Sequence, residues 1–255
     1  MNIEKTGDME PMKLSPVWAD EFNYEGPPDP AKWVLESGGH GWGNRELQYY
    51  TDRADAGDAN AYVKGGKLII TVRREDFGGL KYTSARMHSL ASWKYGRLDV
   101  SAKLPSGNGT WPAIWMLGDA YREVDWPACG EIDVMEHVGR RQNILGFSLH
   151  SKLHNHRNKS YLTQSLLYPG VSDGFHVYTL DWEEDRISIL IDGMKAVEWR
   201  NGDGGRDTGP DAWPFNAPFF LILNLAYGGV LGGPPDENRL PLSMEIEYVR
   251  VYQRG

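Results

Sequence analysis

The sequence contains a single cysteine, Cys129, among 255 residues. An intrachain disulfide and a cysteine-rich metal site are therefore excluded. No apolar run approaches the roughly 20 residues that span a bilayer, and residues 1–13 are polar, without the apolar core of a signal peptide. A secretion signal is thus either absent or already removed. The net charge of -8 argues against nucleic acid or an anionic membrane as a partner.

Helical periodicity is also missing, because no stretch sustains it for three turns and only Pro28–Trp33 is expected to form a single turn. Short strand-like runs recur instead, separated by Gly, Pro, Asn and Asp: 67–74, 97–104, 111–117, 176–181, 186–192, 219–225 and 244–252. Asp192-Gly193 between two apolar runs is a hairpin signal. Many short strands with turn signals predict an all-β sandwich.

From about Val17 onward the chain contains no linker, internal repeat or low-complexity segment. We expect a loose leader over residues 1–15 and one domain over residues 16–255, large enough for a substantial core. A sandwich sheet can curve, and alternate residues on its concave face would then line a groove for a polymer. The 10 Trp and 13 Tyr suit such a groove, since flat aromatic faces with polar edges pack against sugar rings.

The stretch Gly130–His137 carries the strongest functional signal. Three carboxylates lie within six of its residues: Glu131, Asp133 and Glu136. Alternation with apolar residues predicts a strand with one wet face, although Glu136 has the wrong parity for that face. A one-residue β-bulge near Val134 or Met135 would bring all three acids together. Close carboxylates repel one another, so stability alone would not place them there, and we interpret the stretch as a catalytic site.

A retaining glycosidase needs two carboxyl groups roughly 5 to 5.5 Å apart, one as nucleophile and one as proton donor. The backbones of Glu131 and Glu136 lie farther apart than this on a strand, so their side chains would have to converge over the sugar. Three other interpretations compete: a solvated acidic strand face, a divalent-metal site, and a salt-bridge ladder with Arg140 and Arg141.

Gly130–Glu136, preceded by Trp126-Pro127, is similar to the active-site strand of glycoside hydrolase family 16. Other stretches resemble the laminarinase branch of that family, the endo-β-1,3-glucanases: His40–Asn44, Glu46–Thr51, Tyr82–Arg86, Gly109–Leu117, Trp18–Phe22 and Tyr248–Tyr252. The resemblance spans about Val17 to Gln253. It implies a β-jelly roll of two curved antiparallel sheets with a concave substrate cleft, in agreement with the strand pattern, and hydrolysis with retention of anomeric configuration.

The resemblance assigns the nucleophile to Glu131, the general acid and then base to Glu136, and an auxiliary role to Asp133. The spacing Glu-x-Asp-x-x-Glu resembles laminarinases and agarases, whereas the lichenases of the family lack the extra residue. The implied substrate is therefore a β-1,3-glucan polysaccharide or oligosaccharide. An agarase-like or mixed-linkage glucan hydrolase is the alternative. A non-catalytic β-glucan-binding protein is a further one, which the two retained glutamates disfavour.

Three tryptophans are candidates for stacking on sugars. Trp111 and Trp115 are four residues apart on one strand and hence share a face, and Trp126 lies just before the catalytic strand. The resemblance implies that such residues contact sugars near the cleavage point. Ordinary core packing is the competing interpretation for each of them.

Four polar residues are further candidates for substrate contact: Asn44, Arg86, His150 and Asn224. The donor fork of Arg86 suits vicinal hydroxyls, but an ion pair with a nearby acid is the alternative. Asn44 lies in a glycine-rich loop and could equally stabilise a turn. Asn224 follows an apolar run and is either satisfied internally or aimed into the groove. The family places His150 near the catalytic acid; with His154 and His156 it could suggest zinc, a minority interpretation.

Catalysis by this family needs no cofactor, but the resemblance implies a structural calcium bound by Glu21, the carbonyl of Gly66 and Glu247. Glu247 is one methylene longer than the usual aspartate. A second departure is Val230-Leu231, which stands where laminarinases carry an aromatic loop residue. We expect a monomer, and we infer an extracellular location from the polymeric substrate alone.

Overall fold

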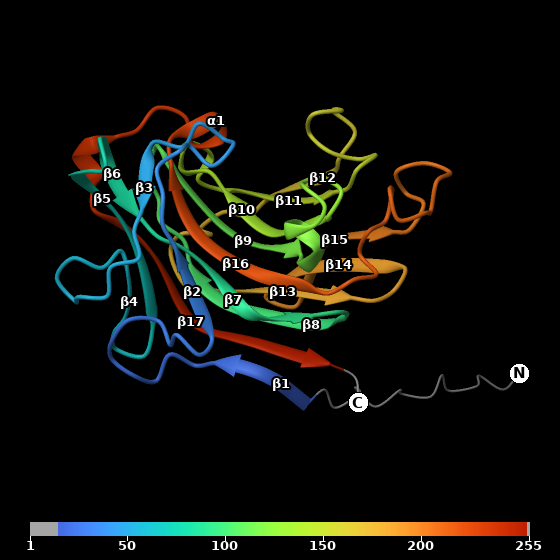
Figure 1. Cartoon of the computed structure of the whole chain (residues 1–255), viewed down its shortest axis with the longest axis horizontal. Coiled ribbons are helices and arrows are strands. Elements are labelled where there is room, and N and C mark those ends of the chain that lie inside the picture. Colours follow the sequence, from blue (N-terminus) through green and yellow to red (C-terminus); the bar gives the residue numbers. More distant parts are fainter. Residues whose placement is uncertain (1–14, 254–255) are drawn as a thin grey trace, which may run out of the picture.

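The computed structural model describes residues 15–253 and shows two curved sheets stacked face to face (Figure 1). The leader expected over residues 1–15 lies outside the described residues except for Ser15, where β1 begins. Within residues 15–253, no helix is long and apolar enough to cross a membrane.

The larger sheet has ten strands. Its main path, with residue bounds, is β15 (Met194–Arg200), β14 (Arg186–Ile191), β13 (His176–Trp182), β8 (Gly96–Lys103), β17 (Leu242–Gln253), β5 (Leu68–Phe77), β6 (Leu80–Ser84) and β3 (Gln48–Tyr50). Two further strands flank this path: β1 (Ser15–Asp20) beside β17, and β4 (Ala61–Val63) beside β5.

The smaller sheet has seven strands, all antiparallel, in the order β12 (Leu162–Leu167), β11 (Ile144–His150), β10 (Glu131–His137), β9 (Thr110–Gly118), β16 (Phe219–Tyr227), β7 (Arg86–Trp93) and β2 (Trp33–Glu36). Four short helical segments lie in the connections: η1 (Asp119–Arg122), η2 (Gly139–Arg141), α1 (Gly229–Gly232) and η3 (Glu237–Arg239). Figure 1 shows α1 and β3 beside one rim of the curved β9–β10–β16 layer. The all-β sandwich and the seven predicted strand runs are confirmed.

Two local predictions agree with the structure and one differs. Asp192 and Gly193 both have positive φ, 51° and 78°, as the tight turn between β14 and β15 requires. Pro28–Trp33 contains the expected single turn, closed by hydrogen bonds to the carbonyl of Asp29, and Trp33 already begins β2. The sheets, expected to be antiparallel, contain one parallel pair, β3–β6. Its crossover connection contains β4 and β5.

The main core lies between the sheets and follows from strand alternation. In β5, Leu68, Ile70 and Val72 are fully buried at every second position. Burying each such side chain contributes roughly 1.5–3 kcal/mol. A satellite cluster of Leu117, Cys129 and Ile222 lies apart from this core. It packs the end of the β9–β10 connection against the smaller sheet.

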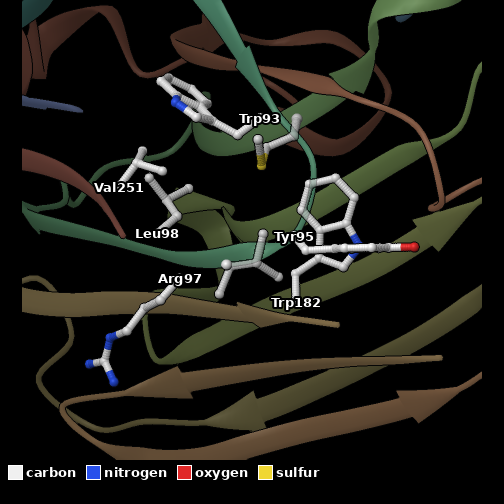
Figure 2. Close-up of a pocket in the computed structure, with 9 residues that line it drawn as sticks. Trp93, Tyr95, Arg97, Leu98, Trp182 and Val251 are labelled. Atoms are coloured by element: carbon white, nitrogen blue, oxygen red, sulfur yellow. The ribbon is translucent and has the colours of Figure 1, made fainter. Parts of the chain in front are cut away.

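A small cavity remains inside the sandwich, lined by Trp93, Leu98, Trp182 and Val251 among others (Figure 2). Its volume is about 10 Å³, which is at most enough for one water molecule. The guanidinium of Arg97 points away from these side chains in Figure 2. The cavity is therefore a packing defect rather than a ligand site.

We expect Gly118→Ala to destabilise the fold strongly, because a Cβ at this position would lie 1.9 Å from the carbonyl oxygen of Cys129. Forced overpacking of this kind costs about 1–3 kcal/mol or more. Gly57→Ala is the matched control, since nothing lies within 4 Å of its added Cβ. Thermal unfolding of both variants measures the difference. Equal melting temperatures would contradict the close packing of Gly118 against the β9–β10 connection.

Candidate active site

Strand β10 contains one residue more than its neighbours on both sides. Against β9, Asp133 pairs with Trp115 and Met135 pairs with Ile114, so Val134 is inserted. The ladder to β11 shifts in the same interval. Val134 and Met135 are both fully buried although they are adjacent. Because both side chains enter the core, the extra residue is needed to return the chain to its former parity, and the predicted bulge is confirmed.

The bulge brings the three acids onto one face. Along β9 they lie opposite alternate residues, in order Leu117, Trp115 and Ala113. Along β11 they lie opposite alternate residues again, in order His150, Ser148 and Gly146. Alternate residues of a regular strand share a face, so Glu131, Asp133 and Glu136 do as well.

His150 and Trp111 contact the acids directly. The Nε2 atom of His150 lies 3.5 Å from Oε1 of Glu131 and 3.3 Å from Oδ2 of Asp133. Trp111 donates its indole N–H to Oε1 of Glu136 at 3.0 Å. One catalytic candidate is therefore oriented by an imidazole and the other by an indole.

Burial shapes the charge of this cluster. It raises the pKa of Glu131 to about 8, with further increases from the charges of Asp133 and Glu136. Burial, followed by the charge of Glu136, raises the pKa of Asp133 well above its usual range. Burial also raises the pKa of Glu136, opposed by the Trp111 hydrogen bond and by His150. The cluster therefore retains protons at pH values where isolated carboxyls are ionised, which the proton donor requires, whereas the nucleophile must lose its proton before it reacts.

Trp115 and Asn224 form a second polar pair on this face. The indole N–H of Trp115 donates to Oδ1 of Asn224 at 2.8 Å. The amide Nδ2 of Asn224 donates to the hydroxyl of Tyr50 at 3.1 Å. Asn224 is thus satisfied internally, while the Trp115 ring stays partly exposed. Sugar stacking by Trp115 remains a prediction that this exposure permits.

Arg86 forms an ion pair, one of the two roles that the sequence left open for it. Its Nε lies 2.9 Å from Oε2 of Glu36 in the neighbouring strand β2. The guanidinium also lies over two indole rings, 4.7 Å from the centroid of Trp42 and 4.8 Å from that of Trp115. Arg86 is therefore a structural link between the glycine-rich loop and the sheet, and its contact with substrate stays a prediction.

Asn44 lies where two rim loops meet. Its carbonyl accepts from the backbone N–H of Val230 at 2.9 Å, and its amide donates to Glu46 at 3.3 Å. Val230 and Leu231 in α1 are 54% and 38% exposed. This rim therefore presents two aliphatic side chains to solvent.

Trp126 lies beside His150, with 5.7 Å between ring centroids. Its ring stacks with His156 at 4.7 Å, and the guanidinium of Arg157 lies 4.6 Å from its centroid. Tyr161 stacks on His150 at 5.0 Å. The β11–β12 connection thus folds over Trp126, and part of its ring is covered by protein.

Several site residues were not predicted: Glu36, Trp42, Tyr50, Arg157 and Tyr161. Glu36 and Trp42 reach Arg86 only through strand pairing and loop folding, which leave no local mark in the sequence. The aromatic composition was the one available signal for Tyr161. Arg140 and Arg141 lie exposed in η2, and within residues 15–253 neither forms an ion pair, so the salt-bridge ladder is not present.

Metal binding can be judged from the partners of each acid. Glu131, Asp133 and His150 place one ligand atom each within 4.8 Å of one another, the one such group among the described residues. At the expected calcium site, Arg250 donates to both oxygens of Glu21 at 2.7 and 2.8 Å, and Ser101 donates to Glu247. Glu21 would have to leave its ion pair with Arg250 to bind calcium. Calcium stays an untested prediction.

Cys129 is buried in the satellite cluster beside the catalytic strand. Burial, together with the nearby charge of Glu131, raises the pKa of its thiol to about 12. The thiolate is the reactive form, so this cysteine acts as an inert packing residue.

Glu131→Gln should stabilise the protein, and more so as the pH rises. The pKa of the Glu131 carboxyl rises from 4.5 in the unfolded chain to about 8 in the folded protein. The folded state therefore binds this proton more tightly, and the free energy of unfolding falls as the pH rises from 4.5 to 8. We expect the two proteins to match near pH 4 and the variant to gain about 1 kcal/mol or more above pH 8. Urea unfolding at both pH values measures this. The exposed Glu123→Gln is the control, and a pH-independent difference for Glu131→Gln would contradict the buried-charge account.

Comparison with known proteins identifies the family. Residues 48–250 match the model described as glycosyl hydrolases family 16. A beta-glucanase of Rhodothermus marinus is 46% identical over 247 residues, which cover 93% of this chain and 84% of that protein. Two further relatives are longer: the clotting factor G alpha subunit of Tachypleus tridentatus and the glucan endo-1,3-beta-glucosidase A1 of Niallia circulans. The chain spans 34% and 37% of their lengths.

Solved structures agree. The laminarinase from Rhodothermus marinus superposes with a TM-score of 0.88 at 44% identity, covering 94% of this chain and 97% of that one. A non-specific endo-beta-1,3(4)-glucanase of family 16 gives a TM-score of 0.87 at 39% identity, covering 96% and 93%. Because the family model matches most of the chain and the Rhodothermus marinus relative is 46% identical over 93% of it, the chain belongs to glycosyl hydrolase family 16.

Proposed function

We propose that this protein is an endo-acting β-1,3-glucan hydrolase that retains anomeric configuration. The observation that carries the proposal is the bulge in β10, which places Glu131, Asp133 and Glu136 on one face. Two carboxyl groups on one face can attack and protonate the same glycosidic bond. The names of the laminarinase and endo-beta-1,3(4)-glucanase neighbours support a β-1,3-linked glucan as the substrate.

In the first step, Glu131 reacts as its carboxylate, and one of its oxygens attacks the anomeric carbon while the bond to the leaving-group oxygen breaks. Glu136 transfers its proton to that oxygen, so the leaving chain departs as a neutral alcohol. The indole of Trp111, bonded to Glu136 at 3.0 Å, holds the carboxyl in place. The products are a glycosyl ester on Glu131 and an ionised Glu136.

In the second step, Glu136 takes a proton from a water molecule, whose oxygen attacks the anomeric carbon and breaks the ester. Glu131 leaves as a carboxylate, and Glu136 is protonated again. Asp133 and His150 contact each other beside Glu131 and can share a proton as its charge changes between the two steps. Two inversions give overall retention.

Substrate contacts are proposed for the residues that line the same face. Trp115 and Trp126 present partly exposed rings, and further contacts are proposed for Asn44, Arg86, Trp111 and His150. Asn224 is satisfied internally and supports Trp115 instead. We further propose that the enzyme acts outside the cell, because a glucan polymer does not enter the cell. A monomer is proposed as its oligomeric state. No cofactor takes part in catalysis.

Mixed-linkage activity is the second candidate, favoured by the endo-beta-1,3(4)-glucanase neighbour. Release of reducing ends from laminarin, lichenan and agarose compares the three candidate substrates directly. We expect laminarin to be cleaved fastest and agarose not at all. Cleavage of agarose alone would contradict the proposal, and binding of laminarin without cleavage would indicate a non-catalytic glucan-binding protein. Glu131→Gln is the control for contaminating activity.

Azide rescue tests the roles of the two glutamates. Glu136→Ala removes the acid/base residue. The rate of hydrolysis of an activated aryl β-laminaribioside should therefore fall by a factor of about 10²–10⁴. Azide needs no general base, and we expect it to restore turnover with a β-glycosyl azide as product. Glu131→Gln should stay inactive with azide. An α-glycosyl azide from Glu136→Ala would overturn the retaining assignment.

A further inference from the structure

Four side chains form a continuous hydrogen-bonded chain that begins at Trp115, the residue paired with Asp133. Trp115 donates to Asn224 at 2.8 Å, and Asn224 donates to the hydroxyl of Tyr50 at 3.1 Å. Tyr50 in turn donates to Oε2 of Glu46 at 2.8 Å. Asn224, Tyr50 and Glu46 are buried, so each of these polar groups depends on its protein partner.

The direction of the chain is fixed at both ends. An indole nitrogen can only donate, and Oε2 of Glu46 already accepts from the amide of Gln48, whose own oxygen accepts from the backbone N–H of Tyr227 at 2.7 Å. With Glu46 accepting, the hydroxyl of Tyr50 points its proton toward that end and must accept from Asn224. The amide of Asn224 then has to turn its oxygen toward Trp115. Reversing Asn224 would place an N–H group against the N–H of the indole.

Glu46 is held as an acceptor by two further donors. Gln48 donates to its Oε2 at 2.7 Å, and Asn44 donates to its Oε1 at 3.3 Å. Burial raises the pKa of Glu46, whereas these donated hydrogen bonds favour its charged form. The backbone of Glu46 also bridges to Gly228 at the start of the loop that carries α1.

The geometry points to Glu46 as a positioning residue that sets the orientation of Trp115 through Tyr50 and Asn224. It touches neither the reacting atoms nor the three acids. Its effect on substrate rests on the proposed function, because it acts through Trp115 as a sugar-stacking ring. Its effect on the indole hydrogen bond does not rest on that function.

Three variants separate the links of the chain. Tyr50→Phe removes the hydroxyl that fixes Asn224. Glu46→Ala removes the acceptor, so the Tyr50 hydroxyl is free to donate to Asn224 and reverse its amide. Glu46→Gln keeps an oxygen that can accept from Tyr50. Tyr178→Phe is the matched control, since Tyr178 is fully buried and its hydroxyl has no partner in the described structure.

The first readout is the indole ¹⁵N–¹H resonance of Trp115, assigned with Trp115→Phe. We expect Tyr50→Phe and Glu46→Ala to shift this resonance upfield and to speed the exchange of the indole proton with solvent. Glu46→Gln and Tyr178→Phe should leave it in place. The second readout is steady-state hydrolysis of laminarin, where the first two variants should raise KM about ten-fold with kcat within about two-fold.

An unchanged Trp115 resonance in Tyr50→Phe would overturn the inference, as would a Glu46→Gln variant that behaves like Glu46→Ala. An equal rise in KM in Tyr178→Phe would also overturn it, because the kinetic effect would then be only structural. If the wild-type protein does not hydrolyse laminarin, the proposed function fails, and the resonance still decides the positioning role.

Discussion

The active site depends on two adjacent apolar side chains that both enter the core. Val134 and Met135 are fully buried, and a regular strand cannot point neighbouring residues to one side. The inserted residue resolves this conflict and turns Glu136 back toward Glu131 and Asp133. The hydrophobic effect that stabilises the sandwich therefore also sets the catalytic geometry, and the two cannot be changed independently.

The three carboxyls beside the β-bulge destabilise the fold when they ionise. The raised pKa values of all three express that cost. His150 and Trp111 offset part of it, and the remainder keeps a proton available for transfer. Around this centre, hydrogen-bonded side chains and the Arg86 stack hold the aromatic rings, so the site is pre-organised by groups that do not react.

Much of this could be predicted from sequence because it follows from local pattern. Alternation gave the strands, Asp192-Gly193 gave a hairpin, and the parity of Glu136 required the bulge. The partners of Arg86 could not be predicted, since Glu36 reaches it through pairing of β2 with β7 across 50 residues of chain. The parallel β3–β6 pair and the covering of Trp126 by His156 likewise arise from tertiary folding, which no local motif encodes.

The central claim is that the bulge aims Glu131 and Glu136 at one anomeric carbon. A crystal structure of the enzyme trapped with a 2-deoxy-2-fluoro laminaribiosyl fluoride tests it most directly. The account predicts an ester bond to Glu131, with the carboxyl of Glu136 on the same face and roughly 5–5.5 Å away. A separation of about 6.5–9.5 Å with a water between the carboxyls, or an adduct on another residue, would contradict it.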